Sequence, residues 1–189
     1  DFPGAANGLQ IANKGRVSCI GASVDAGLVP FQRALERNVD FLIVHHGLFW
    51  IPPIPITGKN YEKVKLLIEG DCAVYGCHLP LDAHPEIGNN ALLAFRLGLS
   101  PVNTFMPFEG KDLGLLADCP YDRNELGERL NTLFPGGISA LEFGPEDPER
   151  IAIVTGSGAS ALPELQAAGV STLITGELRQ HHYNQAQEA

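Results

Sequence analysis

The stretch "RVSCIGASVDAGLVPFQRALERNVDFLIVHH", residues 16–46, decides the fold class of this chain. Residues 17–25 have the pattern of a strand, and 29–39 have the spacing of a short helix with Pro30 near its start. Residues 40–46 form a second apolar strand. Continuous apolar strands that alternate with helices are typical of a parallel or mixed sheet covered by helices on both faces. The pattern therefore predicts an α/β fold.

The alternation continues beyond residue 46. It predicts a helix over 61–70, a strand over 72–79 and a helix over 86–99. A further strand is expected over 113–119, and Asp122 is expected to cap the helix that follows it.

Residues 150–177 repeat the layout of 16–46, with a strand, a glycine-containing turn, a helix and a second strand. Both copies place polar residues directly after the second strand. In open α/β sheets, ligands bind beyond the carboxyl ends of the strands. The repeat therefore predicts two related halves that face one cleft.

Three parts are expected along the chain. Residues 1–100 form the first α/β half, 101–149 a connecting strand and helix region, and 150–189 the second half. The segment "GPEDPE" at 144–149 is the best candidate for a linker, because it is rich in proline, glycine and acidic residues.

Composition narrows the classes of function. The chain has 189 residues, 44% hydrophobic and 19% charged, and its formal net charge is −9. This balance, with no run of Lys or Arg, argues against a nucleic-acid-binding protein, although a small anionic substrate stays possible. No signal peptide and no apolar run of membrane-spanning length is found, so we expect no membrane contact and a cytoplasmic location.

The histidines at strand ends are the strongest chemical signal. His45 and His46 end the second strand, His78 ends the third, and Asp82 follows four residues later. Imidazole with carboxylate is a ligand set for Zn, Fe(II) and Mn. Adjacent histidines in extended backbone point in different directions, so they share one ion only at a turn, or they serve two ions. Two interpretations stay open: a metal site, or ordinary hydrogen-bonded residues.

Two other segments are weaker candidates. The turn "TGSGAS" at 155–160 either presents backbone N–H groups to an anion or is a plain tight turn. The C-terminal segment 176–189 carries Glu177, His181 and His182, which we expect to lie beside a metal site and not to bind the ion directly.

Several motifs together resemble one family. They are "NGLQ" (7–10), "DFLIVHHGLFW" (40–50), "YGCHLPLDAHPEIGNNALLA" (75–94), "TGSGAS" (155–160) and "LITGELRQHH" (173–182). Their order is that of the Nif-three-like, or YbgI-type, proteins, which are also called GTP cyclohydrolase I type 2 homologues. The resemblance covers nearly the whole chain.

The resemblance implies two related α/β domains with a dinuclear metal site in the cleft between them. It implies that His45, His46 and Asp82 bind two divalent ions (Fe, Zn or Mn), with His78 at or beside the site, and that the protein forms a ring-shaped homohexamer. Family members also carry a later GH-x-x-[ST]-E motif whose His and Glu complete the site. That motif is not among these 189 residues, so we expect a second half shortened at its C-terminal end and an under-occupied site.

The function that follows is a metal-dependent hydrolase acting on a nucleotide or a similar heterocycle. For GTP, the family implies opening of the imidazole part of guanine, with His78 or Glu177 handling protons. One alternative is a non-enzymatic metal-binding scaffold or regulatory protein, whose metal site would be closed by protein ligands. Another is a phosphate-binding module that uses residues 155–160 and keeps its affinity in the presence of a chelator.

Overall fold

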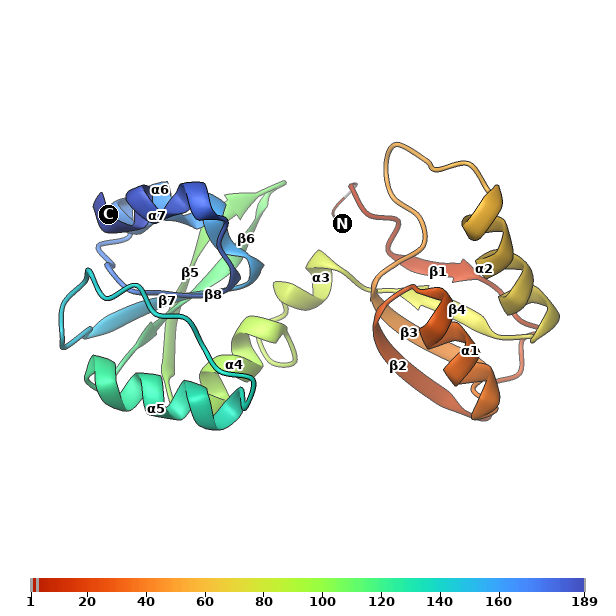
Figure 1. The fold of residues 1–189 in the computed structure, drawn as a ribbon, viewed down its shortest axis with the longest axis horizontal. Helices are drawn as coiled ribbons and strands as arrows, with labels where there is room; N and C mark the ends of the chain where they lie inside the picture. The colour runs from red at the N-terminus through yellow and green to blue at the C-terminus, as the bar shows by residue number, and fades with distance from the viewer. Residues whose placement is uncertain (1, 3, 189) are drawn as a thin grey trace. The chain divides into compact units, whose positions relative to one another are not determined.

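The computed structural model describes residues 2 and 4–188. The chain folds as two compact units, Asp1–Leu81 and Asp82–Ala189. Each unit has its own four-stranded sheet with helices packed against it (Figure 1). The predicted α/β class is therefore confirmed.

The first unit alternates strands and helices as the sequence predicts. Its elements are β1 (Gly8–Ile11), β2 (Ile20–Asp25), α1 (Leu28–Glu36), β3 (Phe41–His46), α2 (Gly58–Glu69) and β4 (Ala73–Gly76). The strand order is β1-β4-β3-β2. Strands β2, β3 and β4 are parallel, and β1 runs antiparallel to β4.

Both helices of the first unit lie on one face of its sheet. Phe31 of α1 and Leu67 of α2 are fully buried against Val44 and Val74 of the strands. The connections β2–α1–β3 and β3–α2–β4 move across the sheet in the same direction. Because such connections are right-handed, both helices lie on the same side of the sheet. The opposite face carries exposed apolar side chains from all four strands, among them Leu9, Ile20, Ile43 and Tyr75. Among the described residues of this unit, helices cover one face of the sheet, whereas the sequence predicts cover on both faces.

The second unit is built around a mixed sheet. Its elements are α4 (Asn89–Leu97), β5 (Ser100–Phe108), β6 (Lys111–Asp118), α5 (Arg123–Leu133), β7 (Arg150–Ser157), the 3-10 turn η1 (Gly158–Ala161), α6 (Leu162–Ala167), β8 (Leu173–Glu177), η2 (Gln180–His182) and α7 (Tyr183–Glu188). The short helix α3 (Leu79–Asp82) contains the boundary between the units. The strand order is β5-β6-β7-β8, and of its three strand pairs β7 with β8 is the parallel one.

Helices cover both faces of this second sheet. Alternate residues of β7 enter two different cores: Ile151 and Ile153 pack with α4 and α5, whereas Ala152 and Val154 pack with α6. This alternation is the expected period of a strand. Figure 1 shows α4 and α5 on one side of the sheet and α6 on the other.

Two local predictions in the second unit are confirmed. Asp122 caps α5, because its Oδ1 atom accepts a hydrogen bond of 2.8 Å from the backbone N–H of Glu125. The repeat also holds at the level of topology, since β2–α1–β3 and β7–α6–β8 are both parallel strand–helix–strand units. Among the residues that the structure describes, each helix is too short or too polar to cross a membrane.

Candidate metal centre

Three histidines meet at one edge of the first sheet. Strands β3 and β4 are parallel, so their carboxyl ends lie at the same edge. His45 and His46 end β3, and His78 follows β4 by two residues. The ring centroids are 4.8 Å apart for His45 and His46, 5.0 Å for His45 and His78, and 5.4 Å for His46 and His78.

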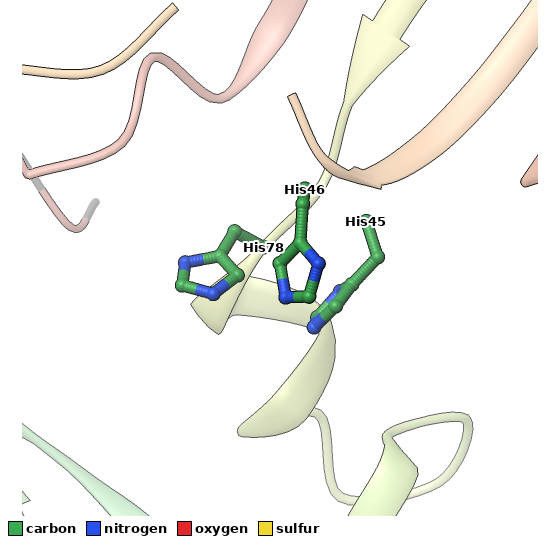
Figure 2. Close-up of side chains that lie close together, drawn as sticks. All are labelled: His45, His46 and His78. Atoms are coloured by element: carbon green, nitrogen blue, oxygen red, sulfur yellow. The ribbon is translucent and has the colours of Figure 1, made fainter. Parts of the chain in front are cut away.

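The nitrogen atoms of this histidine cluster (His45, His46 and His78) suit a metal ion. One ring nitrogen of each residue lies within 4.8 Å of those of the other two. Figure 2 shows the three imidazoles converging from the ends of the strands. Because three imidazoles form a common ligand set for borderline divalent ions, the cluster could hold one.

The backbone fixes the ring of His45. Its Nδ1 atom lies 2.9 Å from the carbonyl oxygen of Cys77, which directly follows β4. The backbone N–H of Cys77 in turn donates to the carbonyl of Val44, at 2.9 Å. A carbonyl oxygen can only accept, so Nδ1 of His45 carries the proton in this contact. In a neutral ring protonated at Nδ1, the lone pair lies on Nε2.

His46 is held from the other neighbouring strand. Its Nδ1 atom lies 2.7 Å from Oδ1 of Asp25, the last residue of β2. Strands β2 and β3 pair in the register that sets Asp25 opposite His46. The two adjacent histidines thus have different neighbours, one beyond β4 and one at the end of β2. Because a different neighbour holds each ring, two consecutive residues of β3 both belong to the same cluster.

The segment before β2 supports the cluster through "NGLQ". The Asn7 side chain accepts a hydrogen bond of 2.9 Å from the backbone N–H of His78. Gln10 accepts from the backbone N–H of Leu48, at 2.7 Å, and donates to the carbonyl of Ala6, at 2.6 Å. These bonds tie β1 and the residues just before it to the loops that follow β3 and β4.

Trp50 borders the cluster on the loop after β3. Its ring lies nearly perpendicular to that of His78, at a centroid distance of 4.9 Å and an angle of 77°. The indole N–H donates to the carbonyl of Gly47, at 2.9 Å, which fixes the ring on this loop. An apolar ring therefore flanks one of the three imidazoles.

Gly47 should tolerate no side chain. A Cβ atom there would lie 2.7 Å from Oε1 of Gln10 and closer still to its Nε2. Because hydrogen bonds hold both of these atoms, Gln10 cannot move aside without losing them. We expect Gly47→Ala to displace Gln10 and to lower the free energy of unfolding by about 1–3 kcal/mol. Urea denaturation measures this change. Gly4→Ala is the control, because a Cβ atom at Gly4 meets nothing within 4 Å; equal stability of the two variants would contradict the bracing role of Gln10.

Asp82 is not one of the three clustered residues. It begins the second unit, where its Oδ1 atom accepts hydrogen bonds from Nδ2 of Asn89, at 2.6 Å, and from Oγ1 of Thr155, at 3.4 Å. These contacts orient the carboxylate from two elements of its own unit. Its assignment as a metal ligand stays a prediction.

The residues of the C-terminal segment lie in the second unit. Glu177 is an exposed residue at the end of β8. The rings of His181 and His182 are 3.9 Å apart, and Nδ1 of His182 accepts from the backbone N–H of Arg179, at 3.1 Å. Desolvation lowers the pKa of His182 below its ordinary value, and the positive charges of His181 and Arg179 lower it further. The proposed roles of Glu177 and His78 in proton transfer stay predictions.

The turn at 155–160 has an internal partner. The backbone N–H of Gly158 donates to Oγ1 of Thr175, at 2.9 Å, and that hydroxyl donates to the carbonyl of Gly156, at 3.1 Å. A Cβ atom at Gly158 would collide with Thr175. The contacts support the interpretation as a tight turn packed on β8.

Sequence reasoning missed Asp25, Asn7, Gln10 and Trp50. Asp25 could have been found, because it ends the strand before β3 just as His46 ends β3 itself. Parallel neighbours place such residues side by side. The contact of Asn7 with the residue 71 positions later leaves no periodic signal in the sequence.

Comparisons with known proteins agree with this fold. A model of the family described as Duf34/NIF3 (NGG1p interacting factor 3) matches residues 3–189. Two relatives, each named "GTP cyclohydrolase 1 type 2 homolog", are both 39% identical: one from Deinococcus radiodurans (96% of this chain, 70% of the relative) and one from Halobacterium salinarum (98% and 76%). A solved structure described as protein ybgI, of unknown function, superposes with a TM-score of 0.88 at 34% identity, over 98% of this chain and 74% of that one.

Proposed function

The chain belongs to the Duf34/NIF3 (NGG1p interacting factor 3) family, and from this premise we propose that it is a divalent-metal-dependent hydrolase. The observation that carries the proposal is the histidine cluster at the carboxyl ends of β3 and β4. Nitrogen ligands in this number suit Zn, Fe(II) or Mn.

The surroundings of the cluster fit a bound ion. His45 and His46 each turn Nδ1 to an acceptor, Cys77 O and Asp25 Oδ1 respectively. Histidines that bind metals in proteins almost always hold a partner through their other nitrogen in this way. The donor set and its orientation therefore both support a metal site.

We assign the ligand roles as follows. His45, His46 and Asp82 bind, as the family resemblance implies, and His78 joins them because its ring lies in the cluster. Neighbouring histidines that are fixed from different strands support a site for two ions, with Asp82 as the carboxylate ligand. Glu177 remains the candidate for proton transfer.

An enzyme is favoured over a scaffold by the number of ligands. Structural zinc sites are closed by four protein ligands, whereas catalytic sites keep a position open. Three imidazoles on one ion, or these imidazoles and Asp82 shared between two ions, would leave such a position. An ion bound there would lower the pKa of a water molecule to about 7 and supply hydroxide.

The substrate class rests on the names of the relatives. They are called GTP cyclohydrolase 1 type 2 homologues, so GTP or a similar heterocycle is the proposed substrate. His45, His46 and His78 would hold the ion, and Trp50 would shield one side of the site from water.

The same resemblance supports a homo-oligomer, a hexameric ring, which light scattering on the purified chain tests.

The test combines metal loading with turnover. The chain is loaded anaerobically with Fe(II), Zn²⁺ or Mn²⁺ and incubated with GTP, and mass spectrometry follows the ring-opened product. We expect product with a loaded chain, and its loss with chelator or with His46→Ala. His84→Ala is the matched control, because Nδ1 of His84 only accepts from two backbone N–H groups of its own turn. Metal binding without turnover of any nucleotide would favour the scaffold.

A further inference from the structure

We propose that Asp25 is a positioning residue of the metal centre, one that holds His46 in the tautomer whose Nε2 atom can bind a metal ion. The inference rests on the proposed function and adds to it the side chain that orients one ligand. Its geometric basis is the contact of 2.7 Å between Oδ1 of Asp25 and Nδ1 of His46.

The chemistry of the contact decides the tautomer. An ionised carboxylate has no proton to give, so it can only accept a hydrogen bond. The proton of the neutral His46 ring must then lie on Nδ1, and the lone pair lies on Nε2. The negative charge also makes the imidazole a better electron donor to a metal, which is the usual effect of a carboxylate behind a metal-bound histidine.

The backbone fixes where this carboxylate lies. The N–H of Ala26 donates to the carbonyl of His46, at 2.9 Å, so the parallel pairing extends to the end of both strands. The hydroxyl of Ser23 donates to the carbonyl of Asp25, at 3.1 Å. The carboxylate is thus delivered beside His46 by the strand register.

Asp25 contributes little to packing. Its side chain is 71% exposed, and that of His46 is 45% exposed. Substitution of Asp25 therefore removes the contact with His46 and leaves the buried core of the first unit intact. This exposure separates an effect on the metal centre from an effect on folding.

The second histidine provides an internal comparison. His45 has the carbonyl oxygen of Cys77 as its acceptor, and no side-chain substitution removes a backbone carbonyl. Loss of Asp25 should change the tautomer of His46 and leave that of His45 as it is. A general disturbance of the sheet would move both.

The first test reads the tautomers without metal. Long-range ¹H–¹⁵N spectra of the imidazoles distinguish Nδ1–H from Nε2–H and from the doubly protonated ring. We expect Nδ1–H for both residues in the natural chain, and a gain of Nε2–H at His46 alone in Asp25→Ala. Val24→Thr is the control, because it alters an exposed side chain of the same strand and keeps the contacts of Asp25. The Nε2–H form at His46 in the natural chain would overturn the proposal.

The second test measures affinity for Co²⁺ by competition with a coloured chelator. We expect Asp25→Ala to bind on the order of 10- to 100-fold more weakly, Asp25→Asn to lose less because it keeps an oxygen acceptor, and Val24→Thr to match the natural chain. Unchanged affinity in Asp25→Ala would overturn the role of Asp25 alone. Failure of the natural chain to bind Co²⁺ would overturn the metal centre itself, and the positioning role with it.

Discussion

We expect His78→Ala to lose affinity for divalent metal by on the order of 100-fold, about 3 kcal/mol of binding free energy. The variant removes one of three imidazoles whose nitrogens lie within 4.8 Å of one another. The variant leaves His45, His46 and the proposed ligand Asp82, and each protein ligand that is lost weakens the hold on the ion. Elemental analysis after dialysis against a weak chelator measures the loss.

The fold of this variant should survive. The backbone N–H of residue 78, which donates to Asn7, is kept when the side chain is shortened. The contact with the edge of Trp50 is lost, so a small decrease in stability is expected. His84→Ala serves again as the control and should keep its metal. Equal metal content in the two variants would remove His78 from the centre.

The second large effect concerns stability. Asn90 is a buried polar residue of the second unit, with 4% of its surface exposed. Its Nδ2 atom donates to the carbonyl of Leu113, at 2.6 Å, and its Oδ1 atom accepts from the backbone N–H of Thr155, at 2.8 Å. Nδ2 also donates to the carbonyl of Asp82, at 3.4 Å. One side chain thus satisfies three backbone groups, one each from α3, β6 and β7.

Asn90→Ala leaves these groups without their partner and creates a cavity. We expect the free energy of unfolding to fall by about 2–4 kcal/mol, measured by urea denaturation and by faster amide exchange at Thr155. Asn131→Ala, on the exposed side of α5, should change stability by no more than about 0.5 kcal/mol. A change at Asn90 as small as that at Asn131 would mean that water replaces its hydrogen bonds.

Much of the fold could be predicted because the spacing of apolar residues that defines a strand or a helix lies within a few consecutive residues. The strands that end at Asp25 and His46, and the helix capped by Asp122, follow from apolar spacing and capping chemistry. Strands β1 and β5 were not predicted. Strand β1 is short, β5 is interrupted by prolines and polar residues, and both lie at sheet edges. An edge strand buries too little to impose a pattern on its sequence.

The candidate site divides in the same way. Three histidines at successive strand ends could be expected to meet, because parallel strands share one carboxyl edge. Their partners depend on pairwise geometry: the register of β2 on β3 brings Asp25 to His46, and the chain before β1 brings Asn7 to His78. Such contacts join residues far apart in the sequence and have no period, so only the folded chain reveals them.

The central claim is that imidazoles of this chain bind a divalent ion, and X-ray absorption of the Zn²⁺-loaded chain tests it most directly. We expect a nitrogen and oxygen shell at about 2.0–2.1 Å, with multiple scattering from imidazole that is weaker in His46→Ala. A sulfur shell at about 2.3 Å would instead place the ion on cysteine. That result, or a shell without imidazole, would contradict metal binding by His45, His46 and His78.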